Sequence, residues 1–132
     1  MKQITEDYCS FETAKLLKEK GFDEYCGTAY TTTEGYPIRI MGSTYSLERN
    51  SDYDEFHYSM PSQSLALKWL REVHKLDIDI SIEYKNSKKV YYYSVLKKTV
   101  IRDIDCLHSE TNFDSYEQAT EAALKYTLEN LI

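Results

Sequence analysis

Three segments repeat apolar residues at the spacing of an α-helix, with polar residues between them. The first follows Ser10, a residue type that caps helices, and stops before Gly21. The second opens with Pro61, which suits a first helical position, and the third follows Asp114, with Glu117 three residues further on. This pattern predicts helices over residues 10–20, 61–75 and 115–131.

A strict two-residue alternation marks residues 77–84, where isoleucines alternate with acidic or small polar residues. Residues 86–87, an Asn-Ser pair, then turn the chain into a second apolar run. With this pair at the tip, Ile82 faces Tyr91 across a hairpin, and the register of both strands follows. A third strand over residues 100–107 is expected to continue the antiparallel arrangement.

Residues 28–41 are rich in threonine, tyrosine and isoleucine, and Glu34-Gly35 divides them into two runs, which predicts a second hairpin. Pro37 has no backbone N–H, so the second strand of this hairpin is expected at the edge of a sheet. Residues 42–60 are polar and are expected to be irregular, with one short strand near residues 56–58.

These elements predict an α+β fold in a single domain spanning residues 1–132. A chain of 132 residues has the usual size of one domain and can bury one core. Strands and helices do not alternate regularly, which disfavours a doubly wound parallel sheet. We therefore expect one antiparallel sheet, made of the hairpin 28–41 and a meander over 77–107, packed with the three helices.

The net charge is −6, from 16 basic and 22 acidic residues, which disfavours non-specific binding to DNA or to anionic membranes. Residues 61–102 nevertheless hold 9 basic and 4 acidic residues, a charge of +5 between two acidic flanks. The sequence shows no apolar run of membrane-spanning length and no secretory signal. Three cysteines without a CxxC pair are expected to be free thiols, as in the reducing cytoplasm. We therefore expect a cytoplasmic protein, and the lack of a long apolar run favours one that binds no membrane.

The sequence contains no complete catalytic or metal-binding motif. Cys106 and His108 are the closest Cys/His pair, but a structural zinc site needs four ligands, so we expect no metal. Neither a P-loop nor a GxGxxG motif is present, and no other cofactor is expected. A further hypothesis is a small thiol hydrolase that uses Cys106 or Cys26 together with a histidine. No glycine-rich elbow accompanies either cysteine. These observations favour a protein that is not an enzyme.

An interaction surface is expected on one face of the hairpin predicted over residues 77–97. Val90, Tyr92 and Leu96 lie on the face opposite the isoleucines, so both faces carry apolar residues. Such a hairpin is covered on both sides, by another part of the chain or by another protein. The chain also has 13 tyrosines, a residue type enriched at interfaces. The favoured partner is therefore an unidentified protein or a second copy in a homodimer.

The same hairpin supports an alternative, a weak single-stranded nucleic-acid binder. Residues 84–98 interleave lysines, which neutralise phosphates, with tyrosines, on which bases stack. Tyr91 and Tyr93 are expected on the buried face, which leaves mainly Tyr92 free to stack. The residues that would carry this function are Lys85, Lys88, Lys89, Tyr92, Lys97 and Lys98.

Three segments, SFETAKLLKEKGF, PSQSLALKWLREVH and DSYEQATEAALKYTLENLI, resemble a group of small uncharacterised proteins of Bacteroides-type gut bacteria and their prophages. The shared motifs are helix signatures, so the resemblance implies a common fold and no particular chemistry. It also implies an intracellular accessory protein linked to a phage or mobile element. The expected function is therefore that of a non-enzymatic accessory protein, acting through protein–protein interaction or self-association.

Overall fold

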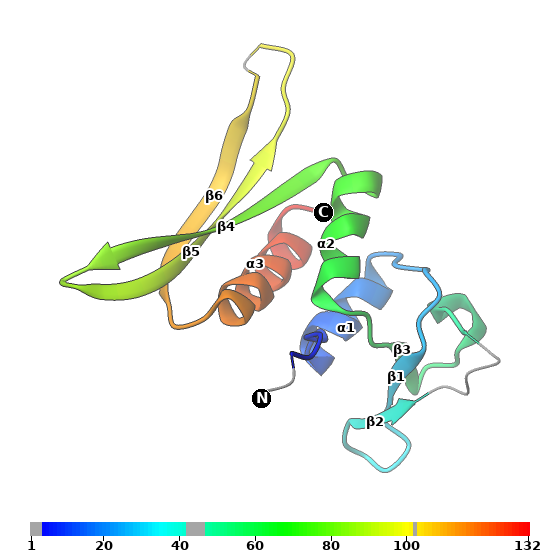
Figure 1. Cartoon of the computed structure of the whole chain (residues 1–132). Coiled ribbons are helices and arrows are strands. Elements are labelled where there is room, and N and C mark those ends of the chain that lie inside the picture. Colours follow the sequence, from blue (N-terminus) through cyan, green and yellow to red (C-terminus); the bar gives the residue numbers. More distant parts are fainter. Residues whose placement is uncertain (1–3, 42–46, 102) are drawn as a thin grey trace. The chain divides into compact units, whose positions relative to one another are not determined.

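A computed structural model describes residues 4–41, 47–101 and 103–132 and shows an α+β fold (Figure 1). The chain divides into two compact units, residues 1–64 and 65–132. In chain order the elements are α1 (Phe11–Glu19), β1 (Thr28–Thr31), β2 (Ile38–Met41), the 3₁₀ turn η1 (Asn50–Asp52), β3 (His57–Ser59), α2 (Gln63–Val73), β4 (Leu76–Lys85), β5 (Lys88–Lys97), β6 (Asp105–Phe113) and α3 (Tyr116–Asn130). The three predicted helices and the α+β class are confirmed.

The first unit begins with α1, whose ends are set by the residues that the sequence indicated. Ser10 caps the helix, because its hydroxyl accepts a hydrogen bond from the backbone N–H of Thr13 at 3.2 Å. Gly21 adopts a φ of 92°, a conformation that glycine reaches without strain, and the chain leaves the helix there. Ala14 and Leu17 are buried on the inner side of α1.

A three-stranded antiparallel sheet with the order β2-β1-β3 accompanies α1. It confirms the hairpin predicted over residues 28–41, and β2, which follows Pro37, is an edge strand as expected. The short strand predicted near residues 56–58 is β3. The ring of Phe11 meets the rings of Tyr30 and Tyr58 edge-on, at centroid distances of 5.6 and 5.3 Å, and joins α1 to the sheet.

A buried carboxamide holds the irregular part of the first unit in place. The side chain of Asn50 donates a hydrogen bond to the backbone carbonyl of Phe22 at 2.8 Å. Its oxygen accepts a hydrogen bond from the backbone N–H of Ser59 at 2.9 Å. Asn50 thus links the segment after α1 to β3, and it satisfies a backbone donor and a backbone acceptor that water does not reach.

The second unit contains the hairpin of β4 and β5, with the predicted register. Ile82 pairs with Tyr91, as expected, and the two-residue turn lies between Lys85 and Lys88. Asn86 and Ser87 have φ values of 51° and 65°. Positive φ at both central residues identifies a type I′ turn, whose twist matches that of the two strands.

Helix α3 covers one face of this second sheet, whose strand order is β4-β5-β6 (Figure 1). Leu76, Tyr93, Val95 and Ala123 form its buried core. Partly buried residues surround this core: Ile78, Ile80, Phe113, Ala122, Tyr126, Leu131 and Ile132. The isoleucine row therefore faces the helix over the first half of β4, as the alternation predicted.

The third strand differs from the sequence prediction. It was expected over residues 100–107, whereas β6 spans Asp105–Phe113. Val100 and Ile101 are fully exposed in the connection before it. Two register shifts interrupt the pairing of β5 with β6, and Asn112 adopts a φ of 75° at one of them. Each extra residue interrupts the two-residue alternation of side chains, so the alternation does not indicate where the strand lies.

The sequence also predicted one sheet, whereas the hairpin and the meander belong to two separate three-stranded sheets. The pattern within each strand does not reveal which strands pair at their edges, because that pairing joins residues far apart in the sequence. The boundary between the two units falls in the first turn of α2. The single domain over residues 1–132 stays a prediction.

Candidate interaction surface

The sequence-predicted surface residues lie on the face of the second sheet opposite α3, with different exposures. Val90 pairs with Glu83, and Leu96 pairs with Asp77 and Cys106. Val90 is buried, with 6% of its surface exposed, while Tyr92 and Leu96 are half-buried. Tyr92 and Leu96 are therefore accessible, and Val90 is not.

Neighbouring strands of the same chain cover Val90. The hydroxyl of Thr111 on β6 donates a hydrogen bond to the carboxylate of Glu83 on β4, across the central strand β5. This bond lowers the pKa of Glu83. The ammonium of Lys85 supports it, at 3.4 Å from Glu83 Oε1 and 3.0 Å from Asn112 Oδ1. The apolar residue on the second face thus needs no partner chain to explain its burial.

The lysines of the nucleic-acid hypothesis fall into two groups at opposite ends of β5. Lys85, Lys88 and Lys89 surround the hairpin turn, while Lys97 ends β5 and Lys98 follows it. Seven strand residues separate Lys89 from Lys97, a distance of about 26 Å at the usual rise of a strand. A single short oligonucleotide therefore cannot contact all five lysines together with one stacked ring.

The first lysine group is largely occupied by partners within the chain. Lys88 lies 3.4 Å from a carboxylate oxygen of Asp114, and Lys85 contacts Glu83 as described above. The ammonium of Lys89 stands 5.1 Å from the ring centroid of Tyr91. Three cations and two carboxylates leave a net charge of about +1 at the hairpin turn, a weak attraction for a phosphate backbone.

The second lysine group borders an open cleft. Arg71, Lys75, Asp77, Lys98, Thr99 and Val100 line this cleft, which has a volume of about 470 Å³. The ammonium of Lys75 is held by the backbone carbonyl of Glu72 at 2.8 Å. Arg71 lies 3.7 Å from the carboxylate of the same glutamate. The cleft is cationic, but its charged side chains lie on the surface and are partly paired.

Apolar residues that the sequence pattern did not indicate as a surface are exposed where the hairpin extends past α3. Ile82 is 48% exposed and Tyr84 is 70% exposed, on the face that α3 covers further along. The lengths explain the gap: a strand of 10 residues spans about 33 Å, and a helix of 15 residues about 22 Å. Both lengths were visible in the sequence, so this comparison could have identified the uncovered end.

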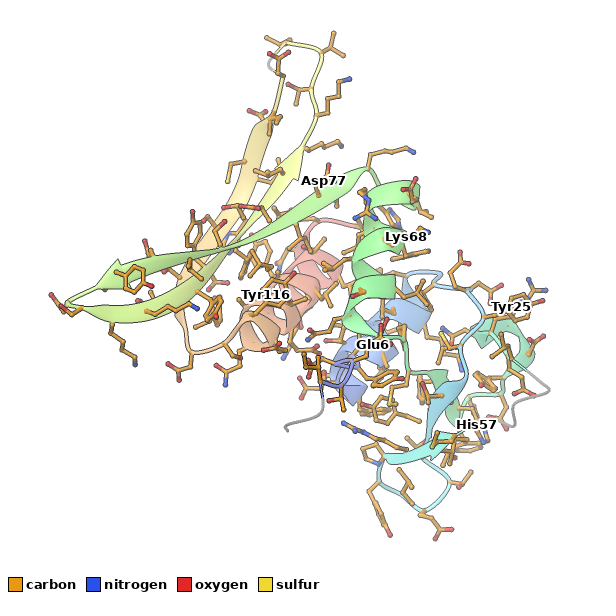
Figure 2. All side chains as sticks on the ribbon, viewed as in Figure 1. Glu6, Tyr25, His57, Lys68, Asp77 and Tyr116 are labelled. Carbon is orange, nitrogen blue, oxygen red and sulfur yellow. The ribbon has the colours of Figure 1, made fainter. Side chains whose placement is uncertain are left out.

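Strand β4 also presents a free backbone edge. It lies at the end of the order β4-β5-β6, and Figure 2 shows the side chains that project along it from Asp77 to the hairpin turn. In the part of the chain that the structure describes, no backbone group on its outer edge has a hydrogen-bond partner. Ten residues of unpaired edge, continuous with exposed Ile82 and Tyr84, form a surface suited to another strand. We call this surface the β4 edge.

The thiol hypothesis has little geometric support. Leu107 is the extra residue of a register shift, so Cys106 shares the face of Leu96 while His108 shares the face of Val95. His108 is instead packed on α3, with its ring stacked on that of Tyr126 at a centroid distance of 3.6 Å. The closest Cys/His pair of the sequence is therefore separated by the sheet.

The other candidate thiol, Cys26, is buried. Its side chain is directed at the backbone carbonyl of Glu24, 3.7 Å away. Burial raises the pKa of the Cys26 thiol to about 11. Because the thiolate is the nucleophile, this environment suppresses reactivity near neutral pH.

We therefore predict that one thiol reacts in the native protein at pH 7. Exposed Cys106 should be alkylated first, and Cys26 and Cys9, both buried, should react only after denaturation. The modification of Cys26 should accelerate as the pH approaches 11, because its raised pKa keeps the thiol protonated below that value. Mass spectrometry of peptides after timed alkylation measures each site, and fully denatured protein is the control. Labelling of Cys26 ahead of Cys106 at pH 7 would contradict this account.

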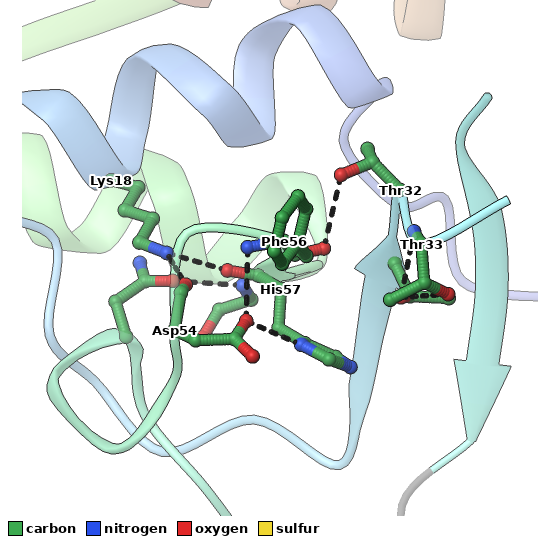
Figure 3. A network of polar contacts seen from close by, with 9 residues as sticks. Lys18, Thr32, Thr33, Asp54, Phe56 and His57 are labelled. Atoms are coloured by element: carbon green, nitrogen blue, oxygen red, sulfur yellow. Dashed lines mark hydrogen bonds and ion pairs between the residues drawn. The ribbon is translucent and has the colours of Figure 1, made fainter. Parts of the chain in front are cut away.

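An aspartate–histidine pair lies in the first unit (Figure 3). The Nδ1 atom of His57 is 2.7 Å from Oδ1 of Asp54, and this bond lowers the pKa of Asp54. The same carboxylate accepts the backbone N–H of Phe56 at 2.9 Å. Lys18 donates to the carbonyls of Asp54 and His57 at 2.5 and 2.6 Å. Among the described residues, no serine or cysteine is hydrogen-bonded to His57, so the pair closes a loop and completes no nucleophilic site.

The described residues form neither a metal site nor a membrane-spanning helix. No group of three or more histidine, cysteine, aspartate or glutamate side chains is placed to hold a metal ion. None of the helices combines the length and apolar character that crossing a membrane requires. No protein-family model, no curated protein and no solved structure matches this chain, and the resemblance of its helical segments stays an expectation.

Proposed function

We propose that this protein is a non-enzymatic binding protein that acts by docking another polypeptide on the β4 edge. The observation that carries the proposal is the unpaired outer edge of β4 beside the exposed side chains of Ile82 and Tyr84. Backbone groups supply affinity when a strand is added to a sheet, and side-chain contacts next to the edge supply specificity. Tyrosine at such a position is a frequent source of binding energy.

The charges near the hairpin turn favour a protein partner over a nucleic acid. Lys85 and Lys88 are already close to carboxylates, so few unpaired cations remain for phosphates. Exposed apolar Ile82 and Tyr84, close to the charged residues of the hairpin turn, instead suit a protein interface, which has an apolar centre and a polar rim. The nucleic-acid alternative keeps one supporting observation, the exposed ring of Tyr84 among the lysines.

The resemblance of three helical segments bears on where this protein would act. It supports a cytoplasmic accessory protein linked to a phage or mobile element. The absence of a membrane-crossing helix among the described residues leaves that setting open. Free cysteines accord with a reducing compartment.

The test compares three immobilised baits against an extract of the source cell and against the purified, tagged chain. The baits are the wild-type protein, Ile82→Lys, and Val100→Lys as a control that adds the same charge at a fully exposed apolar residue away from the β4 edge. We expect the wild-type bait and Val100→Lys to retain the same polypeptide, also after treatment with nuclease. The Ile82→Lys bait should not retain it. Equal retention by all baits, or retention that nuclease abolishes, would overturn the proposal.

A further inference from the structure

We propose that the occupant of the β4 edge is the β4 edge of a second copy, paired antiparallel about a two-fold axis at Ile82. This inference rests on the proposed function, because it names the polypeptide that docks. It joins two three-stranded sheets into one sheet of six strands, with both α3 helices on the same face.

The hairpin turn determines which residues present their backbone outward. In a two-residue type I′ hairpin the residues that flank the turn, here Lys85 and Lys88, exchange both backbone hydrogen bonds. Because bonding alternates along an antiparallel pair, every second residue of β4 points its N–H and C=O away from β5. The outward residues are Leu76, Ile78, Ile80, Ile82 and Tyr84. A docked strand must therefore pair with these positions.

Charge repulsion excludes most of the symmetric registers in which the outward-pointing residues of the two strands pair with one another. A two-fold axis at Ile80 places Asp77 opposite Glu83 of the second copy, and an axis at Ser81 places Asp79 opposite Glu83. An axis at Glu83 itself places two copies of that carboxylate face to face. Like charges directly opposite on neighbouring strands destabilise the pairing. Each of these registers therefore carries a repulsion between acids.

The axis at Ile82 gives opposite charges instead. Asp79 then faces Lys85 of the second copy, and the symmetry makes this attraction twice. On the other face, Ile82 meets its own copy and Ile80 meets Tyr84 of the second copy. These two contacts bury the apolar side chains that α3 leaves exposed. The register keeps residues 79–85 of both strands in pairing, which is seven residues on each side.

Strand β4 lacks several of the features that block edge-to-edge contacts, and in this register its acids Asp79 and Glu83 face Lys85 and Ser81 of the second copy. The strand has no proline and no register shift against β5, and its single lysine lies at the end of the strand. Proteins that avoid edge pairing use these devices, together with short edge strands. Lys85 already contacts Asn112 and Glu83, and its ammonium has three donors, so one remains for Asp79 of the second copy.

The test is a charge exchange followed by analytical ultracentrifugation over a range of protein concentrations. Asp79→Lys and Lys85→Asp each convert two attractions into two repulsions, and the double variant restores them with the signs reversed. We expect wild type to reach twice its mass of 15.5 kDa. Each single variant should raise the dimer dissociation constant by about tenfold or more, and the double variant should return to within about threefold of wild type. Equal weakening by both single variants and by the double variant would overturn the register.

A second measurement does not depend on any substitution. Hydrogen exchange of the wild-type chain should slow at the amides of Ile80, Ile82 and Tyr84 as the protein concentration rises, while the exposed amides of Val100 and Ile101 stay fast. A monomer at every concentration, with fast exchange at these three amides, overturns the self-pairing. If Ile82→Lys then still loses a foreign polypeptide that wild type captures, the proposed function stands and only this inference fails.

Discussion

Replacing Tyr93 by alanine is expected to lower the free energy of unfolding by about 3–5 kcal/mol, the usual cost of removing a large aromatic side chain from a core. Tyr93 is fully buried at the centre of β5, in the core between the second sheet and α3. Its ring lies 5.8 Å from that of Phe113, and its hydroxyl donates a hydrogen bond to Glu110. Denaturant titration followed by circular dichroism measures the loss.

Two variants separate the ring of Tyr93 from its hydroxyl. Tyr93→Phe keeps the ring and should cost about 1 kcal/mol at neutral pH, the typical contribution of one hydrogen bond. That bond lowers the pKa of Glu110, so its contribution is present above the ordinary pKa of a glutamate and is lost as the pH falls through the lowered value. Tyr92→Ala, on the same strand but half-buried on the other face, is the control and should cost less than Tyr93→Ala. A larger loss at Tyr92 would contradict the assignment of the buried face.

Replacing Asn50 by alanine is expected to lower the free energy of unfolding by about 2–4 kcal/mol, because each buried polar group left without a partner costs about 1–3 kcal/mol. The variant removes the donor to the carbonyl of Phe22 and the acceptor for the backbone N–H of Ser59. Thermal or denaturant unfolding followed by circular dichroism measures the change. Asn130→Ala, at an exposed position near the end of α3, is the matched control and should shift stability by about 0.5 kcal/mol or less.

The Asn50→Ala variant also tests whether the chain unfolds as one domain. Asn50 lies in residues 1–64 and Tyr93 in residues 65–132, the two compact units. Trp69 is the single tryptophan and lies in the second unit, so its fluorescence reports on that unit. If one domain spans residues 1–132, Asn50→Ala shifts the fluorescence transition as far as the circular dichroism transition. A fluorescence transition that Asn50→Ala leaves in place would show two independently unfolding units.

Short-range patterns determined the elements of this protein well. The turn residues Asn86 and Ser87 specify a two-residue hairpin, and that turn together with the alternation leaves one register for β4 and β5. The cap Ser10 and the stop Gly21 likewise bound α1. In each case the controlling interaction joins residues within a few positions of one another, so the sequence contains all the information needed.

The position of β6 could not be predicted from the sequence, because register shifts interrupt the two-residue alternation of its side chains. Strand β6 contains two extra residues, at the register shifts beside Leu107 and Asn112, and its side chains do not alternate. The predicted strand was therefore placed too early, at the apolar residues Val100 and Ile101, which are fully exposed. The shift at Leu107 also places Cys106 and His108 on opposite faces of the sheet, although their spacing in the sequence would put them on the same face of a regular strand.

Only the tertiary structure decided which apolar residues form a surface. Val90 resembles an interface residue in sequence, yet it is buried within the chain, paired with Glu83, whose carboxylate is hydrogen-bonded to Thr111. Ile82 belongs to the buried row by its period, yet it is half exposed because α3 is shorter than the strand. The physical reason is the same in both cases. Period and turn chemistry act along the chain and assign a side chain to a face, whereas burial depends on which distant segment reaches that face and where it ends.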